Sequence, residues 1–113
     1  MSIEISETPE KWVIIKIENG EALYKVFGTW AGGYLGSDRW KINSGIVEVK
    51  QDENNYYFIG FSGSCYKCNK NSYGTITSFG LGILNNFIEK SNGRVVVLNE
   101  NQAFETILDF KPH

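Results

Sequence analysis

The chain has 113 residues, 42% of them hydrophobic, and a formal net charge of −2 from 11 basic and 13 acidic residues. This length fits one domain, which can bury a core without metal or disulfides. Nucleic-acid binding depends on neutralising phosphates, yet no run of Lys or Arg reaches three residues. Neither nucleic acid nor an anionic membrane surface is therefore an expected partner.

Residues 1–10 are polar and contain Pro9. We expect them to form a loosely ordered lead-in to a single globular domain over residues 1–113. They lack the basic and apolar regions of a secretory signal, and no apolar run approaches the ~20 residues that span a bilayer. A cytoplasmic protein is the expectation.

Apolar and polar residues alternate over 11–18, which predicts a strand. Asn19 and Gly20 follow at once, and this pair favours a two-residue type I′ turn because both residues tolerate positive φ. Residues 21–27 then read as the returning strand. A second hairpin is predicted from strands at 45–50 and 56–62, joined by the turn residues 52–55. Residues 64–76 are polar and interrupted by glycine, so a loop is expected there.

Phe79, Ile83 and Phe87 recur every four residues, which predicts one main helix. Thr77 or Ser78 can serve as its N-cap, Lys90 lies in its last turn, and Asn92 and Gly93 mark its end. Both phenylalanines are expected in the core. Residues 94–98 form an apolar run typical of a covered strand, and residues 101–110 have the spacing of one or two helical turns. The element order predicts an α+β fold: an antiparallel or mixed sheet of about five strands with one main helix packed on one face.

Residues 28–45 hold five glycines and three large aromatic side chains. Glycine permits close approach of the backbone, and tryptophan and tyrosine bring large amphipathic area. We interpret this segment as a contact surface. Its candidate binding residues are Trp30, Gly32, Gly33, Tyr34, Ser37, Asp38, Arg39, Trp40 and Asn43. Two arrangements of the rings remain open: an outward-facing patch joined by Tyr66 and Tyr73, or a lid folded over one end of the sheet.

No catalytic group, metal site or cofactor is predicted. Cys65 and Cys68 form a C-x-x-C, but the following residues read as loop, whereas a redox pair needs a helix N-terminus. A structural zinc site needs four ligands, and the only histidine is the terminal His113. The glycines at 32, 33 and 36 lack the lysine of a phosphate-binding loop.

Three stretches carry a resemblance: WVIIKI at 12–17, YKVFGTWAGGYLGSDRWKINSGI at 24–46 and GFSGS at 60–64. Together they resemble small uncharacterised accessory proteins of tailed bacteriophages, over about residues 11–63. The matching positions are Trp12, Tyr24, Lys25, Val26, Trp30, Gly32, Gly33, Gly36, Ser37, Asp38, Trp40, Asn43, Ser44 and Gly45. The resemblance implies a phage or prophage origin and a bacterial cytoplasm, and it brings no activity, cofactor or catalytic residue.

Two hypotheses follow. The first is a non-enzymatic protein-interaction module that binds a host or phage protein, or a second copy of itself, through residues 28–45; an exposed strand edge is one route to self-association. The alternative is a small-ligand protein or minor enzyme acting on a nucleotide or sugar, with Ser37, Asp38, Arg39 and Asn43 around a loop-lined pocket.

Overall fold

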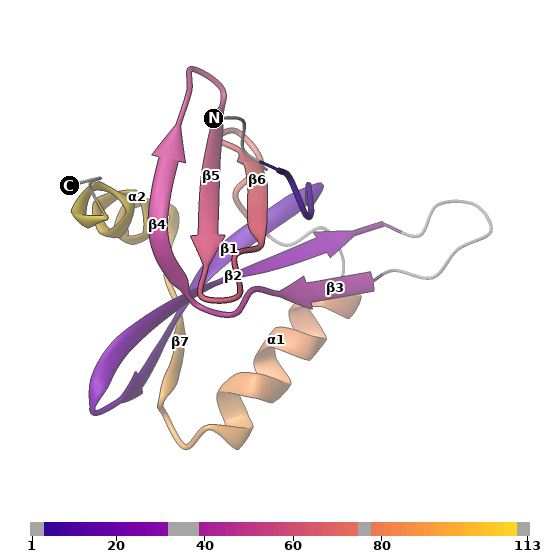
Figure 1. Cartoon of the computed structure of the whole chain (residues 1–113). Helices are drawn as coiled ribbons and strands as arrows, with labels where there is room; N and C mark the ends of the chain where they lie inside the picture. Colours follow the sequence, from indigo (N-terminus) through magenta and orange to yellow (C-terminus); the bar gives the residue numbers. More distant parts are fainter. Residues whose placement is uncertain (1–3, 32–38, 75–77, 111–113) are drawn as a thin grey trace.

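The computed structural model describes residues 4–31, 39–74 and 78–110, and shows two antiparallel sheets and two helices in this part of the chain (Figure 1). The elements are β1 (Lys11–Asn19), β2 (Glu21–Trp30), β3 (Arg39–Ile42), β4 (Ile46–Gln51), β5 (Asn55–Gly60), β6 (Cys65–Asn69), α1 (Ser78–Lys90), β7 (Val95–Val97) and α2 (Glu100–Asp109). The larger sheet has the order β3-β2-β1-β7, and the smaller has β4-β5-β6. The α+β class is confirmed, and the expected sheet of about five strands with one main helix agrees in part with the seven strands in two antiparallel sheets and the two helices of the described residues.

The first hairpin, β1–β2, is confirmed, with Gly20 at φ 84°. Its turn differs from the predicted one. Glu18 faces Ala22, so the connection is centred on Gly20, whereas a two-residue type I′ turn would place Glu18 opposite Glu21. The pairing continues as far as Lys11 and Thr29, and β2 therefore runs past its predicted end.

Strand β7 lies at an edge of the larger sheet and pairs there with β1. The prediction of a strand is confirmed, but its covered position is wrong. Val95 and Val97 pack towards α1, while Val96 is 47% exposed. Because β7 consists of three valines, its sequence does not show which side chains point to the core and which to solvent; the position of the strand in the sheet determines that.

The second hairpin, β4–β5, is confirmed, and its turn is organised by Asp52. The carboxylate of Asp52 accepts the backbone N–H groups of Asn54 and Asn55 and the hydroxyl of Tyr57, at 2.9, 2.8 and 2.6 Å. These hydrogen bonds favour the charged form and lower the pKa of Asp52 to about 2. Strand β6 lies within residues expected to form a loop, and it owes its extended form to pairing with β5.

An aromatic cluster between the two sheets forms one core. The Trp12 ring packs edge-on to Tyr73 at 4.8 Å and against Phe58 at 5.3 Å, centroid to centroid. The indole Nε1–H of Trp12 donates to the carbonyl of Asn69 on β6 at 2.8 Å. Tyr73 donates its hydroxyl to the carbonyl of Leu98 and accepts the N–H of Ile14. Burial raises the pKa of Tyr73 to about 12.

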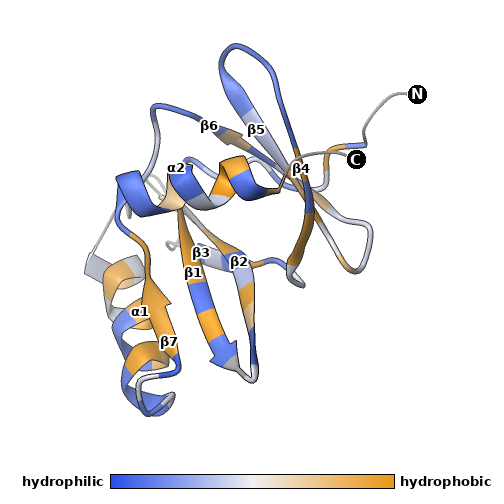
Figure 2. Cartoon of the chain, turned by 90° about the vertical axis from the view of Figure 1, so that its left-hand side faces the viewer, coloured by the Kyte–Doolittle hydropathy of each residue, from blue (hydrophilic) through white to orange (hydrophobic). Residues whose placement is uncertain are grey.

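Helix α1 covers one face of the larger sheet and forms the second core. Leu84 is buried, and Phe87 packs against Phe27 on β2. Figure 2 shows α1 beside β7, with hydrophobic stretches on both elements. The expectation that Phe79 is a core residue is wrong, since its side chain in the first turn of α1 is 45% exposed.

The expected helical turns after residue 100 form the ten-residue helix α2. Asn99 begins it with a capping box, in which its side chain accepts the Gln102 N–H and the Gln102 side chain accepts the N–H of Asn99. Ala103 and Ile107 bury one side of the helix against the aromatic core. Within the described residues, neither helix is both long and apolar enough to cross a membrane.

Candidate functional site

Within residues 28–45, residues 28–30 belong to β2 and residues 39–42 form β3, and the two strands pair as an antiparallel hairpin. Trp30 pairs with Arg39, Thr29 with Trp40 and Gly28 with Lys41. Gly32, Gly33, Tyr34, Ser37 and Asp38 lie outside the described residues. Because side chains alternate between the faces of a strand, Trp30 and Trp40 lie on opposite faces of this hairpin.

Trp40 faces α1. Its ring stacks on Phe27 with 5.6 Å between centroids and 14° between planes, and meets Phe87 edge-on at 5.3 Å. Of the two arrangements left open for the rings, the outward-facing one does not describe Trp40, which is half-buried in the second core. Its packing holds β3 in place against the helix.

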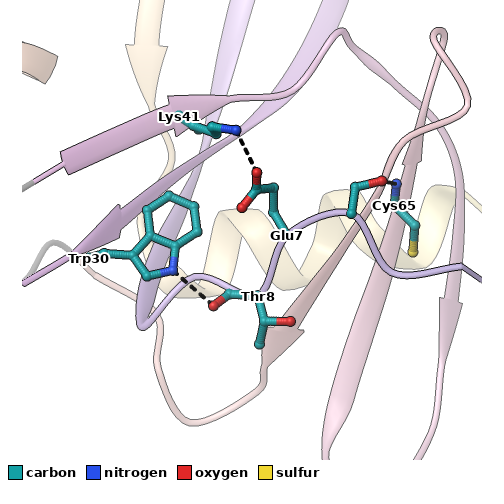
Figure 3. Close-up of polar contacts among 6 residues, drawn as sticks. Glu7, Thr8, Trp30, Lys41 and Cys65 are labelled. Atoms are coloured by element: carbon teal, nitrogen blue, oxygen red, sulfur yellow. Dashed lines mark hydrogen bonds and ion pairs between the residues drawn. The ribbon is translucent and has the colours of Figure 1, made fainter.

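Trp30 lies on the other face, and it too is not an exposed ring. Its side chain is 9% exposed, and its Nε1–H donates to the carbonyl of Thr8 at 3.1 Å (Figure 3). The guanidinium carbon of Arg39 lies 4.5 Å from the centroid of the Trp30 ring. This distance is within the range of a cation–π contact, which orients the exposed Arg39 side chain.

Residues 6–9, which we call the N-terminal strap, cover Trp30. The carboxylate of Glu7 pairs with the ammonium of Lys41 at 2.5 Å (Figure 3). Pro9 is buried against Gly28, where an added Cβ would lie 2.8 Å from the Pro9 Cβ. Only glycine allows this close approach, so Gly28 is what lets the strap pack against this face of the hairpin.

The strap also joins the hairpin to the smaller sheet. The N–H groups of Ser6 and Glu7 donate to the carbonyl of Cys65, and the N–H of Lys67 donates to the carbonyl of Glu7. The hydroxyl of Ser6 accepts the N–H of Cys65 at 3.0 Å. Residues 6–9 thus form a defined connection between β6 and the hairpin, where a loosely ordered lead-in was expected.

Asn43 is a structural residue at the end of β3. It is 2% exposed, its N–H donates to the carbonyl of Val26, and its Oδ1 accepts the N–H of Val26 at 2.8 Å. Its Nδ2 has no hydrogen-bond partner among the described residues. The backbone and the side chain of Asn43 together add one more pair of hydrogen bonds between β2 and the end of β3.

The other candidate aromatics and the cysteines are interior. Tyr66 is buried on β6, and Tyr73 belongs to the aromatic core, so neither extends a surface patch around the hairpin. Cys65 and Cys68 are free and buried, and burial raises the pKa of both thiols, which favours their unreactive protonated form. Within the described part of the chain, no three His, Cys, Asp or Glu residues gather as metal ligands.

The site therefore consists of an exposed guanidinium fixed over an indole, a neighbouring ion pair and the outer edge of β3. These groups suit recognition of an anionic or extended polar partner. Sequence reasoning missed Glu7, Thr8 and Lys41. Lys41 could have been found from its spacing of two residues from Arg39, had β3 been recognised as a strand. Comparison with known proteins found no matching family model, curated protein or solved structure.

Proposed function

We propose that this chain is a non-enzymatic protein-interaction module, of the phage accessory type, that binds a host or phage protein in the bacterial cytoplasm through the β2–β3 hairpin. The observation that carries the proposal is the exposed guanidinium of Arg39, held 4.5 Å from the Trp30 ring centroid on an edge strand. Arginine and tryptophan are enriched among the residues that contribute most to protein–protein binding.

The hairpin is supported on both faces. Helix α1 packs on Trp40, and the N-terminal strap packs on Trp30 and Gly28. A surface that is already ordered loses less conformational entropy on binding than a loose loop does. The same support limits the alternative of a small-ligand pocket. Asn43 Oδ1 accepts the N–H of Val26 and Arg39 lies against Trp30, and these contacts favour the interaction module over the pocket.

Affinity capture from bacterial lysates, with and without phage infection, tests the proposal. Replacing Trp30 or Trp40 would disturb packing, so Arg39→Glu is the informative variant. Lys50→Glu, an exposed charge reversal on β4, is its matched control. We expect Arg39→Glu to lower recovery of a specific partner about tenfold, equivalent to about 1.4 kcal/mol. Equal recovery with both variants, at unchanged circular dichroism, would contradict the proposal.

A further inference from the structure

The two sheets of the described residues end in four edge strands: β3 and β7 in the larger sheet, and β4 and β6 in the smaller. An edge strand presents unpaired N–H and C=O groups, with which another extended chain can pair. Proteins usually cover, bend or shorten such edges. The four edges of this molecule differ in how they are protected.

Three of the edges are protected from pairing with another chain. Glu7 of the strap forms a parallel bridge with Tyr66 and so covers β6. Strand β7 has three residues, and the N–H of Val95 donates to the hydroxyl of Ser91 at 3.0 Å. The register of β4 shifts at Val47, and an irregularity of this kind bends a strand away from regular pairing. Strand β3 is regular, and within the described residues it pairs only with β2.

The backbone groups that β3 offers can be identified from the ladder. The N–H of Asn43 donates to the carbonyl of Val26, opposite which it lies. Hydrogen-bonded pairs alternate with non-bonded pairs along an antiparallel ladder, so Lys41 and Arg39 also turn their backbone groups towards β2. The N–H and C=O groups of Trp40 and Ile42 therefore point to the outer edge.

The side chains along β3 define what an added strand would meet. Arg39 and Lys41 are exposed and lie on one face, with Glu7 as the single carboxylate paired to them among the described residues. Trp40 and Ile42 are half-buried on the other face, which α1 covers. A strand of alternating acidic and apolar residues would match both faces.

We propose that the edge of β3 binds an extended acidic segment of a partner protein as an added strand, with carboxylates two residues apart beside Arg39 and Lys41. The proposal rests on the binding function inferred above for the hairpin. A second copy of this chain fits less well, because pairing β3 with β3 would bring Lys41 and Arg39 of the two copies opposite one another. Like charges directly opposite in a sheet are destabilising.

The test uses the full ¹⁵N-labelled chain and a blocked hexapeptide of sequence Thr-Glu-Val-Glu-Val-Thr, followed by two-dimensional amide NMR. We expect the amide signals of Trp40 and Ile42 to shift and saturate at millimolar peptide, and their hydrogen exchange to slow. The peptide with lysine in place of glutamate is the matched probe, and it should not bind. Arg39→Glu should weaken binding of the acidic peptide by at least about tenfold, whereas Lys50→Glu should leave it unchanged.

Several results would overturn the proposal: no shift at Trp40 and Ile42, equal binding of the lysine peptide, or dimerisation through β3 detected by light scattering and cross-strand contacts. These failures can be told apart from failure of the binding function itself. If Arg39→Glu abolishes capture of a partner while the acidic peptide leaves the β3 amides unchanged, the hairpin is the binding surface but strand addition is not its mode.

Discussion

Trp12 and Trp30 occupy similar places and have different roles. Both lie on long strands of the larger sheet, and each donates its indole N–H to a distant backbone carbonyl, that of Asn69 at 2.8 Å and that of Thr8 at 3.1 Å. Trp12 is fully buried among aromatic rings between the sheets, whereas Trp30 lies between the N-terminal strap and a guanidinium exposed to solvent. The first joins the two sheets, and the second joins the strap to the proposed binding surface.

This comparison predicts its largest effect at Trp12. Replacing Trp12 with alanine removes the centre of the aromatic core and should lower the free energy of unfolding by about 3–5 kcal/mol. Trp30→Ala should cost less, because its ring contacts the exposed Arg39 side chain and lies outside both core clusters. Urea unfolding of both variants measures the two losses. An equal loss in the two variants would contradict the distinction between a core ring and a strap contact.

A smaller effect is expected from the hydroxyl beside Trp12. Tyr73→Phe leaves the carbonyl of Leu98 and the N–H of Ile14 without this partner, and should lower the free energy of unfolding by about 1–3 kcal/mol. Tyr57→Phe is the control, since its hydroxyl contacts Asp52 in an exposed turn. If Tyr57→Phe costs as much as Tyr73→Phe in thermal or urea unfolding, the buried hydroxyl has no special role.

Tyr73 also makes the stability of the protein depend on pH. The folded pKa of Tyr73 is raised from 10.0 to about 12, so the folded state holds this proton more tightly than the unfolded chain does. Its contribution to stability is complete below pH 10 and is lost as the pH rises towards 12. The stability difference between the natural chain and Tyr73→Phe should therefore shrink over this range in unfolding curves. A difference that stays constant from pH 8 to pH 12 would contradict the assignment.

The strap itself can be tested through Gly28. A Cβ at this position would lie 2.8 Å from the Pro9 Cβ, so Gly28→Ala must displace the strap and should cost about 1–3 kcal/mol. It should also speed hydrogen exchange at the N–H of Lys67, which donates to Glu7. Unchanged exchange at Lys67 in this variant would show that the strap does not depend on close approach at Gly28.

The smallest expected effect is a gain. Gly82 lies in α1 with open space where a Cβ would be added. Gly82→Ala should therefore stabilise the chain by up to about 1 kcal/mol, because alanine has the higher helix propensity. Thermal unfolding measures the change in stability. The pair Gly82→Ala and Gly28→Ala compares a glycine with open space beside it and a glycine that close packing requires. A loss of stability in Gly82→Ala would contradict the open space found beside Gly82.

The sequence predicted correctly the elements that depend on interactions between residues close together in the chain. The β1–β2 hairpin follows from Asn19 and Gly20, and α1 follows from the spacing of its apolar residues. Strands β3 and β6 were missed because they are short and carry polar residues, and their extended form comes from pairing with β2 and β5. No local pattern indicates that the sheet divides in two.

The arrangement of the candidate binding segment, residues 28–45, depends on contacts between residues far apart in the sequence. Glu7 and Lys41 are 34 residues apart, and Trp30 and Thr8 are 22 apart. The density of glycine and tryptophan therefore left two interpretations open, an exposed patch or a folded-back lid, because neither contact can be read from the local sequence. One indole packs on a helix, the other lies under a strap, and the exposed group is the arginine between them in the chain.

Site-specific photo-crosslinking tests most directly the claim that the β2–β3 hairpin is the binding surface. A photoreactive amino acid is placed at the exposed Ala31, next to Trp30, and in a second protein at the exposed Glu53, in the β4–β5 turn. We predict that a bacterial or phage protein is crosslinked from position 31 and not from position 53. Crosslinking from position 53 alone, or equally from both positions, would contradict the account.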